Sequence, residues 1–456
     1  MLQAIDPTTG KLVREVESAS AAQVERILAA ADAAWRDWRD AGFQARAEVL
    51  RRAALLMRED VERLAFLMTE EMGKPRHEAV GEVTKAAWCA EHYADHAQAY
   101  LEAQEIASDA TRSYVRHEPL GVILGILPWN APFWLAFRFA APALMAGNTC
   151  VMKHDSHVPG CAAAIAEVFE RAQAPAGVFS NLAVRTPQVE SVIRDPRIQA
   201  VSFTGSERGG GAVASAAAAE IKHAVLELGG SDPAIVLADA KLEEAADTLT
   251  LSRIINAGQS CIAAKRIIVE ASVYDRFTEL MRERLEKLKV GDPRERDTDI
   301  GPLARENLRD NLHRQVRETI DAGARCLLGG EMPSGAGFFY PVTLLADVEN
   351  DMCAAREETF GPVAVLIRAD DEDHAVRIAN DSRYGLAASV WSTAARGEAI
   401  AARLEAGQVA VNGIVKTDPR LPSGGIKRSG FGRELGPHGI HEFVNAKQIW
   451  IGPKVE

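Results

Sequence analysis

The stretch GVILGILPWNAPFWLAFRFAAPALMAGNTCVMK, residues 121–153, determines how the chain folds. It opens with an apolar run that is typical of a buried strand, and Pro132 stands where a helix can begin. The helical segment extends through Phe139 to Met145, and residues 149–153 form a second apolar run. A strand, a helix and a second strand within about 30 residues predict a parallel βαβ unit.

The same alternation continues toward the C-terminus. Helices are expected at residues 161–171 and 210–219, and strands at 178–184, 200–204 and 222–227. Because helices separate most of these strands, the pattern predicts an open parallel sheet with helices on both faces. Such sheets bind nucleotides at the carboxyl ends of their strands.

A second alternating unit is expected between about residues 232 and 425. Its strands are predicted at 235–237, 267–269, 363–367 and 409–411. Two units of alternating strands and helices place the chain in the α/β class.

The N-terminal part is mostly helical. It starts with a strand pair at residues 5–16. Ser20 and Gln23 then form a capping box that opens a helix. Longer helices are expected at about residues 45–72 and 78–101, where apolar residues recur every three or four positions.

The composition excludes several classes of protein. The 456 residues are 47% hydrophobic and 25% charged, which is typical of a globular chain of two or three domains. The net charge of −12 argues against nucleic-acid and membrane partners, because an acidic surface repels phosphate groups and anionic lipids. The first residues carry no secretory signal pattern, and the six cysteines form no CxxC pair. We therefore expect reduced thiols and a cytoplasmic location.

Cys261 is the candidate nucleophile. It ends the motif GQSC (258–261), and Gly258 can terminate the helix that begins near Leu242. Cys261 would then lie on a loop before the next strand, which suits a reactive thiolate. The cysteine alone is weak evidence, because most free cysteines are small buried hydrophobic residues.

Two polar residues follow strands of the first predicted sheet. Glu227 ends the strand at 222–227, and Asn130 comes after the strand at 121–127. At this edge of an open sheet, a carboxylate can accept a proton and an amide can donate to a developing oxyanion. A surface ion pair is the alternative for Glu227, and an Asx turn is the alternative for Asn130.

Two further motifs fit a dinucleotide. In FTGS (203–206), Gly205 and Ser206 lie between a strand and a helix, where backbone N–H groups can face a pyrophosphate. The motif EETFGP (357–362) offers a carboxylate for ribose hydroxyls and a ring to pack on a nicotinamide. A surface turn is the alternative for the second motif.

Together these motifs resemble the aldehyde dehydrogenase superfamily, and the resemblance covers essentially the whole chain. The order PWN (128–130), FTGS, ELGG (227–230), GQSC and EETFGP is similar to that of the family, as is the separation of 34 residues between Glu227 and Cys261. The segments GGIKRSG (424–430) and GRELG (432–436) match as well. The segments EMGKP (71–75), LGGSDP (228–233) and CIAAKR (261–266) look most like bacterial succinate-semialdehyde dehydrogenases.

The resemblance implies a fold of three parts. These are a Rossmann-like NAD(P)-binding domain at residues 1–107 and 124–228, an α/β catalytic domain at 229–431, and a small β oligomerisation segment at 108–123 and 432–456. The strand predicted at residues 442–451 belongs to the last part. An isolated terminal strand needs a partner, for which a neighbouring subunit is one candidate. Members of the family form homodimers or homotetramers.

The resemblance also implies the chemistry. Cys261 would attack the aldehyde, and Asn130 with the Cys261 N–H would hold the oxyanion. Hydride would leave to NAD or NADP, and Glu227 would activate a water molecule that hydrolyses the thioester. Glu434 is a weaker candidate for relaying protons to solvent.

The expected cofactor residues follow from the same match. Lys153 would reach the adenosine ribose, and Ser156 stands where NAD-preferring members commonly have a glutamate. A serine would not repel a 2′-phosphate, so NADP is expected beside NAD or in preference to it. The full set is Trp129, Lys153, Ser156, Gly205, Ser206, Glu358 and Phe360.

Four residues are expected to contact the substrate, namely Arg138, Ala131, Trp134 and Ser423. Arg138 would bind the distal carboxylate of a semialdehyde, and an internal ion pair is its alternative. Ala131 and Ser423 replace phenylalanines that line the aldehyde tunnel in the family. The hypothesis is therefore a bulkier or more polar aldehyde than succinate semialdehyde.

Two other functions compete with aldehyde oxidation. A thiol esterase or acyltransferase could use the same cysteine without a nicotinamide cofactor, and a scaffold could keep the fold without catalysis. No metal site is expected, because His92 and His96 lack a third ligand.

Overall fold

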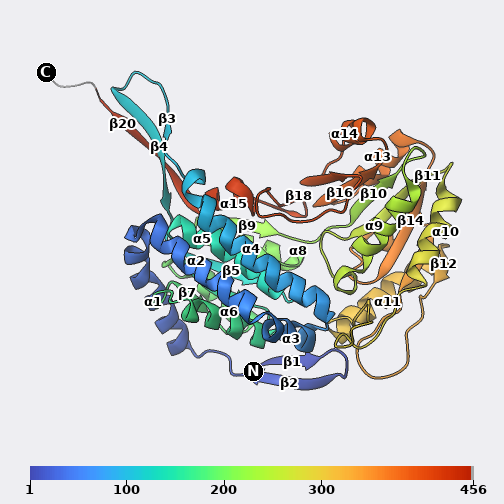
Figure 1. Cartoon of the computed structure of the whole chain (residues 1–456), viewed down its shortest axis with the longest axis horizontal. Helices are drawn as coiled ribbons and strands as arrows, with labels where there is room; N and C mark the ends of the chain where they lie inside the picture. Colours follow the sequence, from blue (N-terminus) through green and yellow to red (C-terminus); the bar gives the residue numbers. More distant parts are fainter. Residues whose placement is uncertain (453–456) are drawn as a thin grey trace.

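Each of the two lobes in Figure 1 is built around a largely parallel sheet. The computed structural model describes residues 1–452. In the first sheet, strands β5 to β9 are parallel to their neighbours, and β19 pairs with β9 in the antiparallel sense. The strand order is β19-β9-β8-β5-β6-β7, with β5 (Val122–Leu127), β6 (Thr149–His154), β7 (Phe179–Asn181), β8 (Ile198–Thr204), β9 (His223–Glu227) and β19 (Gly430–Phe431).

This strand order creates a switch point between β5 and β8. From β5 the chain proceeds to β6 and β7 on one side, and from β8 it proceeds to β9 on the other. Ligands bind beside the carboxyl ends of strands at such a point. The predicted parallel sheet is confirmed, and its helices are α5 (Pro132–Ala146), α6 (Pro159–Arg171), α7 (Val189–Arg194) and α8 (Glu207–Ala219), with a 3₁₀ turn at Thr186–Gln188.

The N-terminal helices pack on the same lobe. The predicted strand pair is confirmed as β1 (Leu2–Asp6) and β2 (Lys11–Val16). The capping box of Ser20 and Gln23 is confirmed at the start of α1 (Ala21–Asp40). The following helices are α2 (Gly42–Glu59), α3 (Val61–Met72) and α4 (Arg76–Tyr100).

The single helix predicted at about residues 45–72 is wrong, because the chain forms two helices there. Asp60 leaves helical geometry with φ −106° and ψ 18°. Its carboxylate accepts hydrogen bonds from Arg63 at 2.7 Å and from Arg171 at 3.3 Å. Apolar residues recur with helical spacing on both sides of Asp60, so the periodicity alone does not reveal the break.

The second lobe contains the predicted second unit. Its sheet has the order β12-β13-β14-β11-β10-β16-β17, in which only β12 and β13 are antiparallel. The strands are β10 (Asp232–Val236), β11 (Ala264–Glu270), β12 (Arg325–Leu328), β13 (Thr343–Ala346), β14 (Val363–Ala369), β16 (Ala387–Trp391) and β17 (Gln408–Val411). The helices are α9 (Leu242–Ile254), α10 (Tyr274–Leu285), α11 (Glu306–Asp321), α12 (Cys353–Arg356), α13 (Glu372–Asn380) and α14 (Ala394–Ala401), and the small ribbon is β15 (Tyr384–Gly385) with β18 (Ile426–Lys427).

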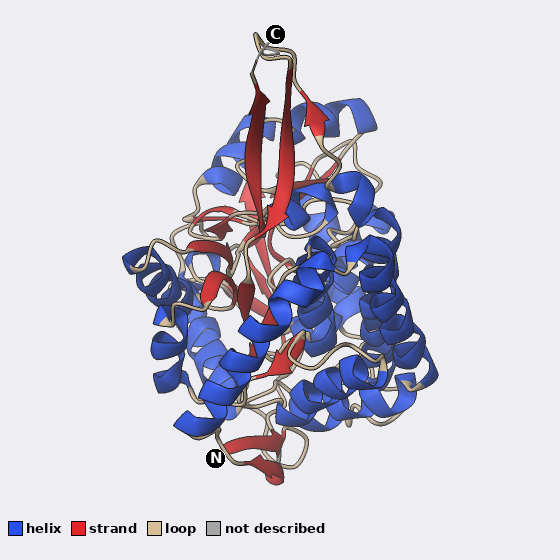
Figure 2. Cartoon of the chain, turned by 90° about the vertical axis from the view of Figure 1, so that its left-hand side faces the viewer, coloured by secondary structure: helices blue, strands red, loops and turns tan. Residues whose placement is uncertain are grey.

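A narrow three-stranded arm projects from the first lobe (Figure 2). It consists of β20 (Val444–Ile451), β4 (Arg112–Pro119) and β3 (Gln104–Glu105), all antiparallel. The predicted terminal strand is confirmed, and its partner is β4 of the same chain. Helix α15 (Gly436–His441) precedes β20, while residues 453–456 of the predicted oligomerisation segment lie outside the described residues. The domain boundaries themselves stay predictions.

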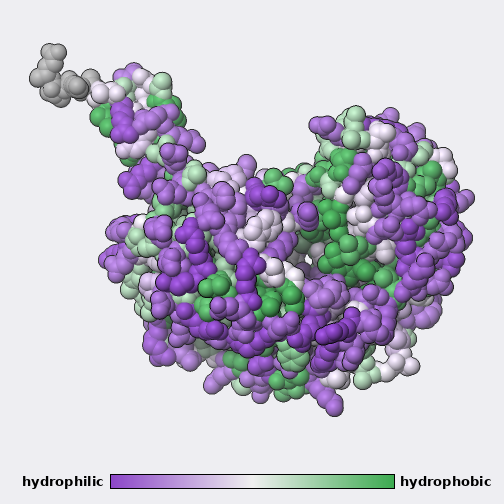
Figure 3. All heavy atoms as spheres, viewed as in Figure 1, coloured by the Kyte–Doolittle hydropathy of each residue, from purple (hydrophilic) through white to green (hydrophobic). Residues whose placement is uncertain are grey.

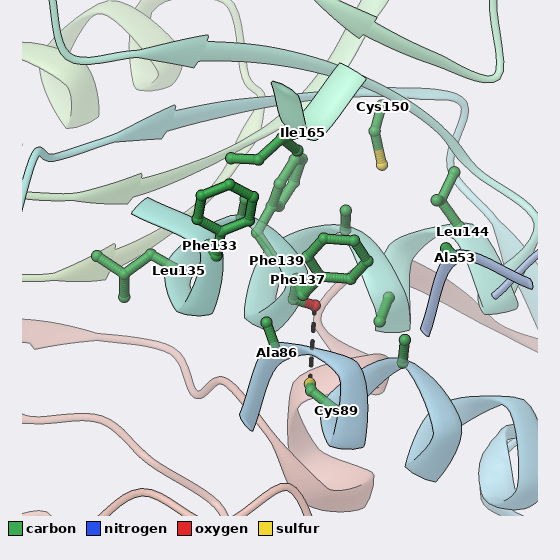
Figure 4. Close-up of a cluster of buried hydrophobic side chains, with 14 of the residues drawn as sticks. Ala53, Ala86, Cys89, Phe133, Leu135, Phe137, Phe139, Leu144, Cys150 and Ile165 are labelled. Atoms are coloured by element: carbon green, nitrogen blue, oxygen red, sulfur yellow. Dashed lines mark hydrogen bonds between the residues drawn. The ribbon is translucent and has the colours of Figure 1, made fainter. Parts of the chain in front are cut away.

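Helix α5 is the most deeply buried helix of the first lobe. Each of its residues is buried, and Figure 4 shows its phenylalanines packed among side chains of neighbouring elements. Gly125 of β5 makes this packing possible, because a Cβ on it would lie 2.4 Å from the Phe139 ring. On the other side, the Cys89 thiol of α4 donates to the Phe137 carbonyl at 3.7 Å. No helix in the described chain is long and apolar enough to cross a membrane.

We expect Gly125→Ala to lower the free energy of unfolding by about 1–3 kcal/mol, because the added methyl group must displace the Phe139 ring. Gly211→Ala is the matched control, since a Cβ on this exposed glycine of α8 meets nothing within 4 Å. The control should gain about 0.5–1 kcal/mol of stability. Urea denaturation followed by circular dichroism measures both, and equal effects of the two substitutions would contradict this account of α5.

Candidate active site

The two sheets meet end to end. Strand β9 of the first sheet ends at Glu227, and β10 of the second sheet begins at Asp232 after the glycines 229 and 230. The carboxyl edge of the first sheet therefore faces the amino ends of β10 and β11. Cys261 lies on the turn before β11, which begins at Ala264. Figure 3 shows the surface hollowed between the two lobes.

The segment before Cys261 has an unusual backbone. Helix α9 ends at Ile254, four residues earlier than Gly258, which the sequence suggested as its end. Asn256, Ala257 and Gly258 then follow one another with φ of 56°, 54° and 74°. A Cβ on Gly258 would lie 2.2 Å from the Gly361 carbonyl oxygen. The cysteine loop and the motif EETFGP are thus in direct backbone contact, which only a glycine permits.

Asn130 is brought to the same loop. Its Nδ2 donates to the Gln259 carbonyl at 3.2 Å, two residues before Cys261. Its backbone oxygen accepts from Lys74 Nζ at 2.9 Å and from Asn256 Nδ2 at 2.9 Å. The predicted pair of Asn130 and Cys261 therefore lies together. Sequence reasoning did not single out Lys74 or Asn256, although Lys74 belongs to the quoted motif EMGKP.

The Cys261 thiol is half-buried. Burial raises its pKa to about 11, while the charges of Lys265 and Arg138 act in the opposite direction. Lys265 Nζ donates to the carbonyl oxygens of Cys261 at 2.5 Å and Ser260 at 2.9 Å. With its pKa raised in this way, the Cys261 thiol is mainly protonated at neutral pH, and its attack on a substrate requires a proton acceptor.

Glu227 has the properties of a proton acceptor. It is only 4% exposed, and its Oε1 has no hydrogen-bond partner among residues 1–452. Burial raises the pKa of this carboxyl to about 8, the positive charge of Arg138 opposes the rise, and the negative charge of Glu434 adds to it. A carboxyl group that titrates near neutral pH with a free oxygen is suited to general base catalysis.

Arg138 forms the internal ion pair that the sequence left as its alternative. Its guanidinium pairs with Glu434 and lies 3.8 Å from Glu227. Although burial lowers the pKa of Arg138, these two carboxylates together raise it. Glu434 also accepts from the Ser202 hydroxyl at 3.2 Å, and its backbone pairs with that of Ser423. The predicted residues Arg138, Ser423 and Glu434 are thus neighbours of Glu227.

Several expected cofactor residues share the carboxyl edge of the first sheet. Trp129 follows β5, Lys153 lies in β6, and Gly205 and Ser206 follow β8. The Gly205 N–H donates to the Glu227 carbonyl at 2.9 Å, and the Ser206 hydroxyl accepts from the Gly209 N–H at 3.2 Å as the cap of α8.

Lys153 is 7% exposed, and burial lowers the pKa of its ammonium. Within the described part of the chain, this ammonium has no hydrogen bond or ion pair. Ser156 is half-buried and follows Asp155. The Asp155 Oδ1 atom lies 2.6 Å from Nδ1 of the His157 ring. The Lys153 ammonium is therefore free to reach a bound adenosine ribose, whereas the Asp155 carboxylate is already paired with His157.

The motif EETFGP contributes from the other lobe. Glu358 accepts from the Gly230 N–H at 3.2 Å and pairs with Lys265 at 3.3 Å. Phe360 packs edge-on against Trp129 with ring centroids 5.9 Å apart. Both residues thus bridge the two sheets beside the cysteine loop. Lys265, which neutralises Glu358, is a further site residue that sequence reasoning missed.

The remaining expected substrate residues flank α5. Ala131 is half-buried at its N-cap, and Trp134 is 6% exposed in its first turn. No group of three or more His, Cys, Asp or Glu in residues 1–452 is arranged to hold a metal ion.

Comparison with known proteins gives consistent matches over the whole chain. The model of the aldehyde dehydrogenase family matches residues 1–449. The chain is 48% identical to a probable NADP(+) succinate-semialdehyde dehydrogenase of Synechocystis sp., over 98% of this chain and 99% of that protein. It is 45% identical to the NAD(P)+ succinate semialdehyde dehydrogenase Sad of Escherichia coli K12, over 98% of this chain and 97% of that protein. The crystal structure of succinic semialdehyde dehydrogenase from Streptococcus pyogenes in complex with NADP+ matches with a TM-score of 0.97 and 36% identity. The match covers 99% of this chain and 100% of that chain.

Proposed function

The chain belongs to the aldehyde dehydrogenase family, and we propose that it oxidises succinate semialdehyde to succinate with NADP or NAD. The observation that carries the proposal is the contact of the Asn130 amide with the Cys261 loop, beside the buried and partly unbonded carboxylate of Glu227. These three groups supply a nucleophile, an oxyanion donor and a base.

The first step forms a bond between Cys261 Sγ and the aldehyde carbon. Glu227 accepts the thiol proton, directly or through a water molecule, and releases it to solvent before the hydrolysis step. The Cys261 N–H makes no hydrogen bond within the described residues, so it is free to donate to the new oxyanion. An amide NH₂ has two hydrogens, and Asn130 uses one on Gln259, which leaves the other for the same oxyanion.

When bound, NAD or NADP would be held by residues such as Lys153 and Glu358, and it would supply the acceptor for the hydride that the aldehyde carbon loses. The product on Cys261 is a thioester, and Glu227 takes a proton from the water molecule that attacks it. Cleavage of the C–S bond releases the carboxylic acid and restores the thiol. The sum is one aldehyde, one oxidised cofactor and one water converted into one acid, one reduced cofactor and one proton.

The choice of substrate rests on the relatives. Two of them are named for succinate semialdehyde at 45–48% identity, which favours this aldehyde over a bulkier one. Ala131 and Ser423 still predict a wider tunnel than phenylalanines would leave. The ratio of kcat/KM between succinate semialdehyde and a panel of larger aldehydes decides between the two.

Glu227→Gln is expected to lower steady-state turnover by about 10²–10⁴-fold, because water activation is lost. A first turnover, followed at pH 9 by stopped-flow absorbance of the reduced cofactor, should persist but be slower, because hydroxide must then replace Glu227 as the acceptor of the Cys261 proton. Cys261→Ala should abolish both phases.

In the wild type, turnover should decline as pH falls below about 8, where Glu227 becomes protonated. A Glu227→Gln enzyme with wild-type steady-state turnover would exclude Glu227 as the base, and ester hydrolysis without cofactor reduction would favour a thiol esterase.

We expect Ser156→Glu to raise the KM for NADP by about tenfold or more, which corresponds to about 1.4 kcal/mol, because a carboxylate repels the 2′-phosphate. The KM for NAD should change much less. Ser156→Gln serves as the control, because a glutamine side chain has nearly the size of a glutamate but carries no charge. Equal changes for both cofactors in the Ser156→Glu enzyme would remove Ser156 from cofactor selection.

We also propose that the arm of β3, β4 and β20 joins subunits into a homodimer or homotetramer. Ile106, Trp450 and Ile451 on the arm are 52%, 48% and 44% exposed, and β20 is an edge strand. Analytical ultracentrifugation should find an oligomer for the wild type and smaller species for Trp450→Asp. Leu12→Asp, at a 51% exposed site on β2 at the opposite end of the molecule from the arm (Figure 1), should leave the assembly intact. A monomeric wild type would contradict the proposal.

A further inference from the structure

Lys85 of α4 carries a charge that the fold does not neutralise. Its ammonium donates to the Thr417 hydroxyl at 2.7 Å and lies 4.1 Å from the centre of the Trp134 ring. Within residues 1–452, no carboxylate lies within ion-pair distance of it. By contrast, Lys74 pairs with Glu82, and Lys265 pairs with Glu358.

This arrangement is costly without a ligand. A half-buried ammonium loses hydration, and neither a hydroxyl nor an aromatic face replaces a counter-ion in full. An apolar side chain such as methionine would cover Trp134 without that cost. A charge left uncompensated at this position therefore favours an anion that is bound in the working enzyme.

The position of Lys85 indicates which anion. Trp134 and Arg138 are four residues apart on α5, so they share one face of the helix. Burial is the main influence on the pKa of both Lys85 and Cys261, and the charge of Arg138 lowers the pKa of each. Thr417 lies between β17 and β18, six residues before the expected substrate residue Ser423. Lys85 thus lies beside the residues expected to contact the aldehyde.

We propose that the Lys85 ammonium, which the Trp134 ring holds in place, and the Thr417 hydroxyl bind the distal carboxylate of the substrate. The inference rests on the proposed function and refines it. Arg138, whose charge is shared by Glu434 and Glu227, instead orients Glu227 and serves as a positioning residue. The enzyme selects aldehydes that carry an anionic group at the far end.

The groups around Lys85 make this selection dependent on pH. The pKa of Lys85 is lowered to about 8, mainly by burial and also by the charge of Arg138, whereas Cys89, Glu82 and Asp418 act in the opposite direction. The ammonium is therefore charged at neutral pH and loses its proton above about pH 8. The KM for succinate semialdehyde should rise above that pH in the wild type, and the KM for butanal should not follow it.

The decisive experiment compares two aldehydes of four carbons, succinate semialdehyde and butanal, in Lys85→Met and Arg138→Met enzymes. Lys85→Met should raise the KM for succinate semialdehyde by about 10- to 100-fold, the usual range for a hydrogen bond to a charged group. Its effect on butanal should be at least about tenfold smaller. Arg138→Met should lower kcat for both aldehydes alike, because it acts through Glu227.

Two further variants separate charge from structure. Lys85→Arg keeps the charge and should recover much of the lost affinity. Thr417→Val removes only the hydroxyl and should raise the KM for succinate semialdehyde several-fold, less than Lys85→Met does. If Lys85→Met affects both aldehydes equally, or if Arg138→Met is the variant that selectively loses succinate semialdehyde, the proposal is wrong.

Calorimetric titration with succinate tests the site without turnover. The wild type should bind succinate, and Lys85→Met should bind it at least about tenfold more weakly. Succinate binding of equal strength in both proteins would overturn the role of Lys85. A wild type that binds succinate through Lys85 but oxidises neither aldehyde would instead contradict the proposed function.

Discussion

The ion pair between Lys74 and Glu82 is the contact on which the geometry of the site depends. Both side chains are buried, and Glu82 Oε1 accepts from the N–H groups of Phe133 at 2.9 Å and Trp134 at 3.2 Å. These are the first free donors of α5, which begins at Pro132. One carboxylate on α4 thus fixes the start of α5, while its lysine partner holds the Asn130 carbonyl.

The consequences of this contact extend through both helices. Because α5 is fixed at its first turn, Trp134 and Arg138 are placed at set positions along it, and α4 presents Lys85 one turn beyond Glu82. A buried ion pair contributes little net stability, since desolvation offsets most of its attraction. Its value here is positional.

The left-handed backbone at residues 256–258 also costs stability and also serves to position groups of the site. Asn256 and Ala257 are not glycines, and each left-handed residue of this kind costs about 1–3 kcal/mol. The Asn256 N–H and side chain offset part of that strain by donating to Glu78 at 2.7 Å and to the Asn130 carbonyl at 2.9 Å.

Local patterns in the sequence were sufficient to predict most of the secondary structure and the positions of the main motifs. The runs at 121–127 and 149–153 form β5 and β6, and the motifs around Asn130, Glu227 and Cys261 lie at the junction of the sheets. What local patterns could not reveal are contacts between distant residues. Arg138 meets Glu434 nearly 300 positions later, and the strand at 444–451 meets β4 rather than a neighbour in sequence. The break between α2 and α3 at Asp60 is a local feature, but the local pattern does not reveal it, because the helical spacing of apolar residues continues across it.

The cations around the site differ in how the fold neutralises them, and the difference separates structure from binding. Lys265 is held by Glu358 and two carbonyl groups, and Arg138 is held by two carboxylates. Lys153 and Lys85 have no such partner in the described chain. Lys153 lies at the edge where a cofactor ribose is expected, and Lys85 lies beside Trp134 on the substrate side. A folded state that leaves these two charges uncompensated is stabilised when ligands supply the missing partners, by RT ln(1 + [L]/Kd) for each ligand. Because the two lysines lie in separate places, the cofactor and the carboxylate of the substrate can stabilise the enzyme independently.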